Sequence, residues 1–190
     1  MTQLVLGLVL FLGIHSISIL APGWRDSMVN RLGALGWKGL YSVASLLAFV
    51  LLVHGYSLAR QEPVVVYQPP TWTRHLAMLL MLPVFPLLLS AYLPGRIKAA
   101  VKHPMLTATK TWALAHLLAN GMLADVLLFG GFLAWAVMDR ISVGKRPVRE
   151  VRAAAPRKFN DLIAIVGGLL IYGLFVGWAH LHLIGVPLMP

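Results

Sequence analysis

The chain contains no cysteine, which excludes disulfides, iron–sulfur clusters, thiolate-ligated haem and c-type haem attachment. Acidic residues are scarce as well, since six Asp and Glu stand against 16 Lys and Arg. Charged residues make up only 12% of the chain, about half the share usual in soluble domains. No internal repeat is evident, and many carriers have one, so a transporter is the least favoured functional hypothesis.

Apolar residues are what the chain has in excess. They make up 59% of its 190 residues, against roughly 45–50% in a soluble domain. They gather into runs close to the ~20 residues with which a helix crosses a membrane. The pattern predicts an all-α integral membrane bundle of about six transmembrane helices, forming a single domain over residues 1–190. The six predicted segments are Leu4–Leu20, Leu40–Tyr56, Leu76–Leu93, Met105–Leu118, Met122–Val137 and Leu162–Leu181.

The breaks between these segments carry their own signals. Residues 22–38 are predicted to be a polar connector, and Pro83 and Pro86 predict a bend in the third segment. Asn160 is a predicted N-cap of the last segment. The glycines at Gly130–Gly131 and the Gly173/Gly177 pair are interpreted as packing faces within the monomer.

The basic residues indicate the orientation of the bundle. Of the 16 Lys and Arg residues, all except Arg60 and Arg74 fall in or next to the first, third and fifth connections. Loops rich in Lys and Arg stay in the cytoplasm, so both termini are predicted to lie on the non-cytoplasmic side. The net charge of +10 is then a topology signal, and nucleic acid is not an expected partner. The basic stretch 140–158 is expected either to touch anionic lipid or to dock a cytoplasmic protein.

Histidines are the most informative polar residues, because ionisable side chains inside a membrane are costly and usually functional. The chain has seven. His15 is predicted to lie well inside the first segment and His116 well inside the fourth. Each is either a metal ligand or a buried, hydrogen-bonded structural residue. The same two interpretations apply to His54, about one turn from the end of the second segment. The other histidines near segment ends are interpreted as interfacial, namely His75, His180 and His182.

Two further residues are candidates for the same site. His103 precedes Pro104 at a helix N-terminus, where the helix dipole favours a neutral ring. That ring either binds a metal or belongs to the helix cap. Asp125 is the only carboxylate inside a predicted span. It either accepts the second ring proton of His116, as carboxylates beside ligating histidines do, or faces water at the interface.

Two histidines on different helices, with no cysteine in the chain, fit a b-type haem held between bundled helices. The fit holds for His15 with His116 and for His54 with His116. A protein metal site built from histidine and carboxylate remains the alternative.

Longer stretches of sequence add a resemblance. Gly13-Ile14-His15-Ser16, the run Pro94–Gly121 with its His103-Pro104 and Trp112-Ala113-Leu114-Ala115-His116, and Ala134–Arg140 resemble the NnrU family of bacterial membrane proteins. That family is similar to the plant 15-cis-zeta-carotene isomerase, a haem b enzyme. By this resemblance His15 and His116 match the haem-ligand histidines and are the expected catalytic residues. His103 matches the histidine of a His-Pro element. Ala113 stands where the isomerase has a cysteine, so a thiolate switch is impossible.

The resemblance implies two functions in the bacterial cytoplasmic (inner) membrane, where the chain would be a multi-pass protein. One is a haem-dependent cis–trans isomerase of a lipophilic polyene, with His103 and Asp125 supporting the His15/His116 site. The other is a non-enzymatic accessory or sensor factor for nitrite and nitric oxide reduction, with respiratory proteins as partners.

Overall fold

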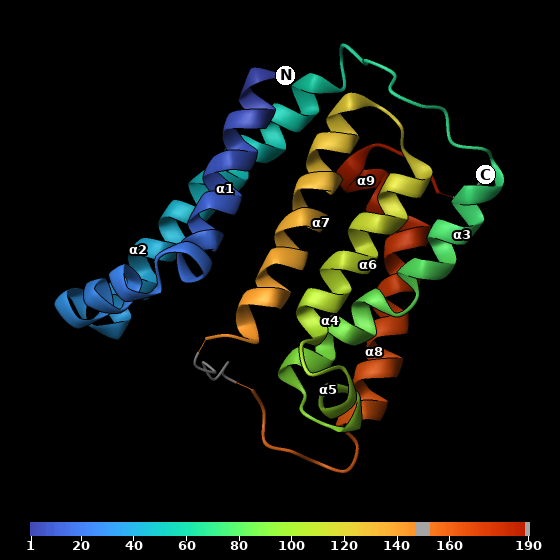
Figure 1. Ribbon diagram of the computed structural model, residues 1–190. Helices are drawn as coiled ribbons and strands as arrows, with labels where there is room; N and C mark the ends of the chain where they lie inside the picture. The colour runs from blue at the N-terminus through green and yellow to red at the C-terminus, as the bar shows by residue number, and fades with distance from the viewer. Residues whose placement is uncertain (147–152, 189–190) are drawn as a thin grey trace. The chain divides into compact units, whose positions relative to one another are not determined.

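The fold is helical throughout the residues that the computed structural model describes, 1–146 and 153–188, apart from one isolated bridge between Val65 and Met122. The middle of the basic stretch, residues 147–152, lies outside this description. Figure 1 shows the elements in order: α1 (Thr2–Leu20), α2 (Pro22–Ala59), α3 (Trp72–Met81), α4 (Val84–Tyr92), α5 (Arg96–Val101), α6 (Pro104–Ala119), α7 (Leu123–Val143), α8 (Asn160–Leu174), the π-helical turn η1 (Phe175–Ala179) and α9 (His180–Ile184).

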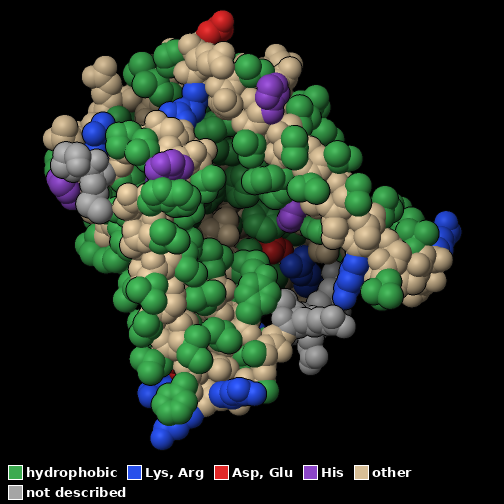
Figure 2. Space-filling model, turned by 180° about the vertical axis from the view of Figure 1, so that it is seen from behind, with side chains coloured by type: hydrophobic (Ala, Val, Ile, Leu, Met, Phe, Trp, Pro, Cys, Tyr) green, Lys and Arg blue, Asp and Glu red, His purple; other side chains and the backbone are tan. Residues whose placement is uncertain are grey.

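Five helical segments among the described residues are long and apolar enough to cross a membrane. They are Thr2–Leu20, Pro22–Ala59, Trp72–Tyr92, Leu123–Val143 and Asn160–Ile184. Figure 2 shows hydrophobic side chains over most of the visible face, as lipid contact requires. The all-α membrane prediction is therefore confirmed. The remaining predicted span corresponds to α6, whose 16 residues rise about 24 Å, less than the ~30 Å of hydrocarbon.

The structure corrects two predicted boundaries. Residues 22–38 are not a connector between two helices, because α2 begins at Pro22 and continues to Ala59 with a break at Gly33, where φ is 74°. Proline suits the first turn of a helix, and glycine adopts a positive φ without the strain that a Cβ would add. The second correction concerns α7, which extends to Val143, past the predicted end at Val137. Asp139 consequently lies inside a helix.

The third predicted segment bends as expected. It forms two helices, α3 and α4, that meet at Pro83. A proline interrupts the ladder of helical hydrogen bonds and clashes with the preceding turn, which accounts for the break.

Contacts group the chain into two compact units, of which unit 1 comprises residues 1–70 and 116–147. In unit 1, α1 lies along α2 (Figure 1) at backbone distance. A Cβ added to Gly7 would lie 2.6 Å from the Leu52 Cα, and one added to Gly55 would lie 2.4 Å from the Leu4 nitrogen. Lipid is as apolar as the side chains, so close packing holds such helices together. The buried core of this unit follows from that approach and joins α7 to the pair: Leu4, Leu52, Ala59 and Ala124.

Unit 2 comprises residues 71–115 and 148–190. Its main contact also depends on a glycine, since a Cβ added to Gly168 of α8 would lie 2.3 Å from the Pro86 nitrogen of α4. Asp161 of α8 accepts the N–H groups of Arg96 and Ile97 at 2.8 and 3.1 Å and so caps α5. Asn160 is the first residue of α8 and the N-cap position is Phe159, contrary to the prediction. It is buried instead, and its amide donates to the carbonyls of Pro94 and Ala155.

The glycines that form these contacts are not those that the sequence singled out. A Cβ at Gly130, Gly173 or Gly177 would meet no described atom within 4 Å, whereas one at Gly131 would lie 3.0 Å from the Leu8 side chain. The packing prediction is therefore confirmed at Gly131 alone. A glycine in an apolar run does not reveal which face of its helix meets a neighbour.

We expect Gly55→Ala to destabilise the protein by about 1–3 kcal/mol, the usual cost of overpacking, because the new methyl group would overlap the α1 backbone. Gly13→Ala is the matched control, since its Cβ would meet open space and alanine is the better helix former. Thermal unfolding in detergent measures both. Equal midpoints for the two variants would contradict the close α1–α2 contact.

Candidate functional site

His15 lies in a pocket of aromatic rings from three helices of unit 1. Its ring centroid is 4.2 Å from that of Phe11, 5.5 Å from Tyr41 of α2 and 6.0 Å from Trp135 of α7. His15 Nδ1 is 2.7 Å from the Phe11 carbonyl oxygen. A carbonyl only accepts, so Nδ1 carries a proton, and in the neutral ring Nε2 keeps its lone pair. A backbone carbonyl commonly orients a metal-ligating histidine in this way.

One buried polar atom around this pocket, the Trp135 indole nitrogen, has no hydrogen-bond partner among the described residues. Ser45, one helical turn beyond Tyr41 on α2, has the Tyr41 hydroxyl as its side-chain partner. A buried donor left unpaired is costly and calls for an explanation, such as a missing ligand or water. The pocket therefore combines the His15 imidazole with an indole N–H that has no partner within the described part of the chain.

A buried acid lies one turn beyond Trp135. Asp139 is 9% exposed and accepts a 2.6 Å hydrogen bond and ion pair from Arg146. Ionised carboxylates are buried in membranes only when paired, so the Arg146 guanidinium allows Asp139 to remain in the helix. The predicted span ends at Val137, before Asp139, so the sequence does not reveal this pair.

Asp125 is buried at the other end of α7. It is 5% exposed, so the interpretation as a water-facing acid is wrong. Its Oδ1 accepts a 2.6 Å hydrogen bond from the Tyr56 hydroxyl, and its Oδ2 accepts the Met122 N–H at 3.3 Å. The Asp125 carboxylate thus caps α7 and, through Tyr56, bonds it to α2. Orientation of His116 by Asp125 stays a prediction.

His116 does not lie well inside its helix, contrary to the prediction. It lies in the last turn of α6, and its ring stacks on Phe129 of α7 at 4.5 Å between centroids. The turn that follows is held by the extended segment 64–67. Val66 and Tyr67 donate their N–H groups to the Gly121 carbonyl at 2.9 and 3.1 Å. A Cβ on Gly121 would overlap the Tyr67 carbonyl oxygen, so only glycine allows this approach.

The Tyr67 side chain also holds the turn after α6 in place. Its hydroxyl donates to the Asn120 carbonyl at 2.7 Å and also lies within hydrogen-bond reach of the Leu117 carbonyl. Burial, with a smaller contribution from the negative charge of Asp125, raises the pKa of Tyr67 above its ordinary value. The protonated hydroxyl is therefore the form that holds the end of α6 in place.

The two expected ligands contact α7 at different positions along its axis. His15 packs against Trp135 and His116 against Phe129, six residues apart on one helix. Six residues correspond to about 9 Å along the axis and about 120° around it. Two imidazoles on one iron need their ring nitrogens about 4 Å apart, at about 2 Å from the metal each. The two rings thus contact different residues of α7, and their joint ligation of one iron stays a prediction.

The remaining candidates lie elsewhere. His54 is on the exposed face of α2, where it borders a shallow, apolar depression of about 370 Å³ with Phe49 and Val53. His103 belongs to unit 2, and its carbonyl accepts the N–H of Thr107 at the start of α6. His75 is exposed. The described residues include no cluster of three or more His, Asp or Glu side chains placed to hold a metal ion.

The sequence analysis missed the aromatic and hydroxyl partners of these groups. A signal for His15 was available, because Leu4, Leu8, Phe11 and His15 recur at helical spacing and so share one face of α1. No such signal marks Tyr56 or Trp135. Their roles arise where α2 and α7 meet, between residues 69 positions apart in the case of Tyr56 and Asp125.

Comparison with known proteins adds one finding. A protein-family model described as NnrU protein matches residues 3–188, nearly the whole chain. No curated protein and no solved structure shows significant similarity to the chain.

We expect Tyr56→Phe to destabilise the protein by about 1–3 kcal/mol, because buried Asp125 would lose its hydroxyl donor. Tyr92→Phe is the control, since Tyr92 is 48% exposed. Chemical denaturation in mild detergent gives both values. If the buried bond matters, adding Asp125→Asn to Tyr56→Phe costs less than the two single changes together. Additive costs would show that the two side chains do not interact.

Tyr67 predicts an alkaline dependence of stability. Its pKa is raised in the folded protein, so the unfolded chain releases the proton first as pH rises. The stabilisation is complete below the ordinary tyrosine pKa of about 10 and is lost as pH rises through the folded value. We expect wild type to lose stability more steeply than Tyr67→Phe over that range. Parallel pH profiles of the unfolding midpoint would contradict the assignment.

Proposed function

Because the chain belongs to the NnrU family, we propose that it is a haem-b-binding protein of the membrane in which His15 ligates the iron. The observation that carries the proposal is the His15 pocket. There the Phe11 carbonyl orients the ring and leaves Nε2 of the neutral ring with its lone pair, and the buried Trp135 indole nitrogen close by has no partner among the described residues.

The chain's own residues have defined tasks in such a site. The Phe11 carbonyl sets the tautomer of His15, and the rings of Phe11, Tyr41 and Trp135 exclude water from it. The Trp135 indole nitrogen offers a hydrogen-bond donor to a bound group. A bound iron porphyrin would supply an open coordination position and one-electron chemistry.

The proposal includes the topology. Six crossings, with α6 as the short fourth, place both termini on the non-cytoplasmic side of a bacterial inner membrane. The distribution of Lys and Arg over the loops supports this orientation, and the five long apolar helices support multiple crossings. Pairing with neighbouring helices or local thinning of the bilayer accommodates a helix of 16 residues.

Two finer functions follow from the site. The first is cis–trans isomerisation of a lipophilic polyene, with His15 as the residue that contacts the catalytic iron. It is supported by the resemblance to zeta-carotene isomerase and by apolar helix faces that a lipid-soluble substrate can reach directly. Ala113 is fully buried and has no thiol, so an enzyme of this kind would work without ligand exchange on sulfur.

The second candidate function is supported by the placement of His116. His116 packs against Phe129, six residues along α7 from the Trp135 that contacts His15, so an iron held by His15 alone would be able to take up a small molecule. An open position suits the binding of nitric oxide by an accessory or sensor factor of nitrogen-oxide respiration.

Visible spectroscopy tests the proposal. We expect protein expressed with sufficient haem and purified in detergent to show a Soret band that His15→Ala abolishes, because the ligand nitrogen is lost. His75→Ala, a change at an exposed histidine, leaves the band intact. Wild type without haem, or a full band in His15→Ala, contradicts haem binding at this pocket.

The His116→Ala variant identifies the second axial ligand. Retained haem with a high-spin spectrum that is unchanged from wild type means that His15 ligates alone. A low-spin wild type that becomes high-spin in His116→Ala means that α6 moves to bring both rings onto the iron. Reconstituted protein is then assayed with a cis-polyene and titrated with nitric oxide. Turnover identifies the enzyme, and tight nitric oxide binding without turnover identifies the sensor.

A further inference from the structure

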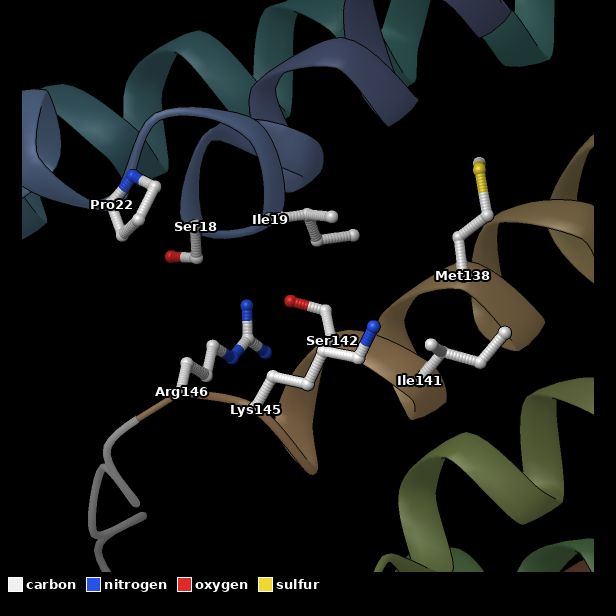
Figure 3. A pocket seen from close by; sticks show the side chains of 8 residues that line it. All are labelled: Ser18, Ile19, Pro22, Met138, Ile141, Ser142, Lys145 and Arg146. Atoms are coloured by element: carbon white, nitrogen blue, oxygen red, sulfur yellow. The ribbon is translucent and has the colours of Figure 1, made fainter.

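A second site lies at the C-terminal ends of α1 and α7, where these apolar helices leave the membrane. Figure 3 shows an open depression between the two helix ends. Its volume is about 450 Å³, and all of its lining belongs to unit 1. The lining residues are Ser18, Ile19, Pro22, Met138, Ile141, Ser142, Lys145 and Arg146.

Arg146 is the residue that indicates a ligand. Its Nη2 donates to Asp139 at 2.6 Å, whereas its Nη1 is buried without a hydrogen-bond partner among the described residues. A guanidinium presents several N–H donors in one plane, which match the oxygens of a carboxylate or a phosphate. Asp139 accepts a hydrogen bond from Nη2 and leaves the other donors of the guanidinium available. A buried, unsatisfied donor is costly, so an acceptor is expected on the side that Asp139 does not cover.

The charge of the site indicates what the acceptor is. Lys145 and Arg146 contribute two positive charges, and Asp139 offsets one of them. Within the described part of the chain Lys145 makes no ion pair. The Ser142 hydroxyl and the Arg146 guanidinium occupy the same space between the helix ends (Figure 3), with Ser18 on the α1 side. One remaining positive charge with hydroxyl donors beside it complements a singly charged phosphodiester.

The other half of the lining is apolar. Ile19 comes from α1, and Met138 and Ile141 of α7 are 52% and 58% exposed. An inorganic anion would make no use of these side chains. A lipid with a phosphate headgroup uses both halves, because its acyl chains would lie on the apolar faces while its phosphate meets the basic groups at the membrane interface.

We propose that this depression binds the phosphate of an anionic phospholipid, with Arg146 and Lys145 as its charged contacts. The site would fix the end of α7 at the membrane surface, about two helical turns beyond Trp135 and the His15 pocket. The proposal depends on Arg146 and its surroundings and not on haem, so either proposal can fail alone.

Thermal unfolding in lipid nanodiscs tests the site. We expect nanodiscs containing phosphatidylglycerol to raise the unfolding midpoint of wild type above its value in phosphatidylcholine alone. Native mass spectrometry of the same protein is expected to show retained phosphatidylglycerol. Lys145→Gln reduces both effects, and Arg146→Gln abolishes them. Because Arg146→Gln leaves Asp139 buried without its partner, Arg146→Gln with Asp139→Asn is made as well and is expected to fold without responding to the lipid.

Lys38→Gln is the matched control, since Lys38 is an exposed cation of α2 outside the depression. It should keep the full response. An equal loss of response in Lys38→Gln and Lys145→Gln would mean a general charge effect and overturn the proposal. So would a full response to phosphatidylglycerol in the variant that lacks both Arg146 and Asp139. If inorganic phosphate with phosphatidylcholine nanodiscs reproduces the shift, the ligand is the free anion and the lipid is overturned as the occupant.

Discussion

The contact between the backbones of α1 and α2 determines the rest of unit 1. Two helices surrounded by lipid gain little from hydrophobicity, so their attraction depends on how closely their surfaces fit. Gly7 and Gly55 remove the side chains at two points of contact, and the opposing backbone of Leu52 and Leu4 occupies that space. This approach turns the Leu4, Phe11 and His15 face of α1 inward, toward α2 and α7. The His15 pocket is thus a consequence of the absence of two side chains.

Helix α7 carries the polar interior that α1 and α2 enclose. Asp125 at one end bonds to Tyr56, and Asp139 near the other end pairs with Arg146. Both acids are buried, and in each case the partner comes from outside α7 or from beyond its end. Between them Phe129 and Trp135 meet the rings of His116 and His15. Because the buried carboxylates near both ends of α7 have hydrogen-bonding partners, the helix can hold its aromatic residues at fixed positions along its axis.

Much of the fold could be predicted because the signals are local. Long apolar runs predicted the helices, and Pro83 predicted the break between α3 and α4. Boundaries were less accurate where helices continue into polar sequence. Residues 22–38 are helical because Pro22 can start a helix and Gly33 can adopt the positive φ at the kink. A search for apolar runs detects neither effect. The site residue His15 was identified from its cost in lipid, whereas Tyr41, Tyr56 and Trp135 are ordinary membrane aromatics until a neighbouring helix places them.

By itself the sequence determined that this is a helical membrane protein without thiol chemistry, with His15 inside its first span. It determined these things because residue composition and spacing along one helix are enough to establish them. Only the tertiary structure decided that His15 and His116 contact α7 about 9 Å apart along its axis and that Asp125 bonds to Tyr56. It also decided that Arg146 keeps a donor without a partner among the described residues. Those facts depend on the rotation and depth of one helix against another. They are set by close packing at positions such as Gly7 and Gly55, which no local pattern distinguishes from the open glycines Gly173 and Gly177.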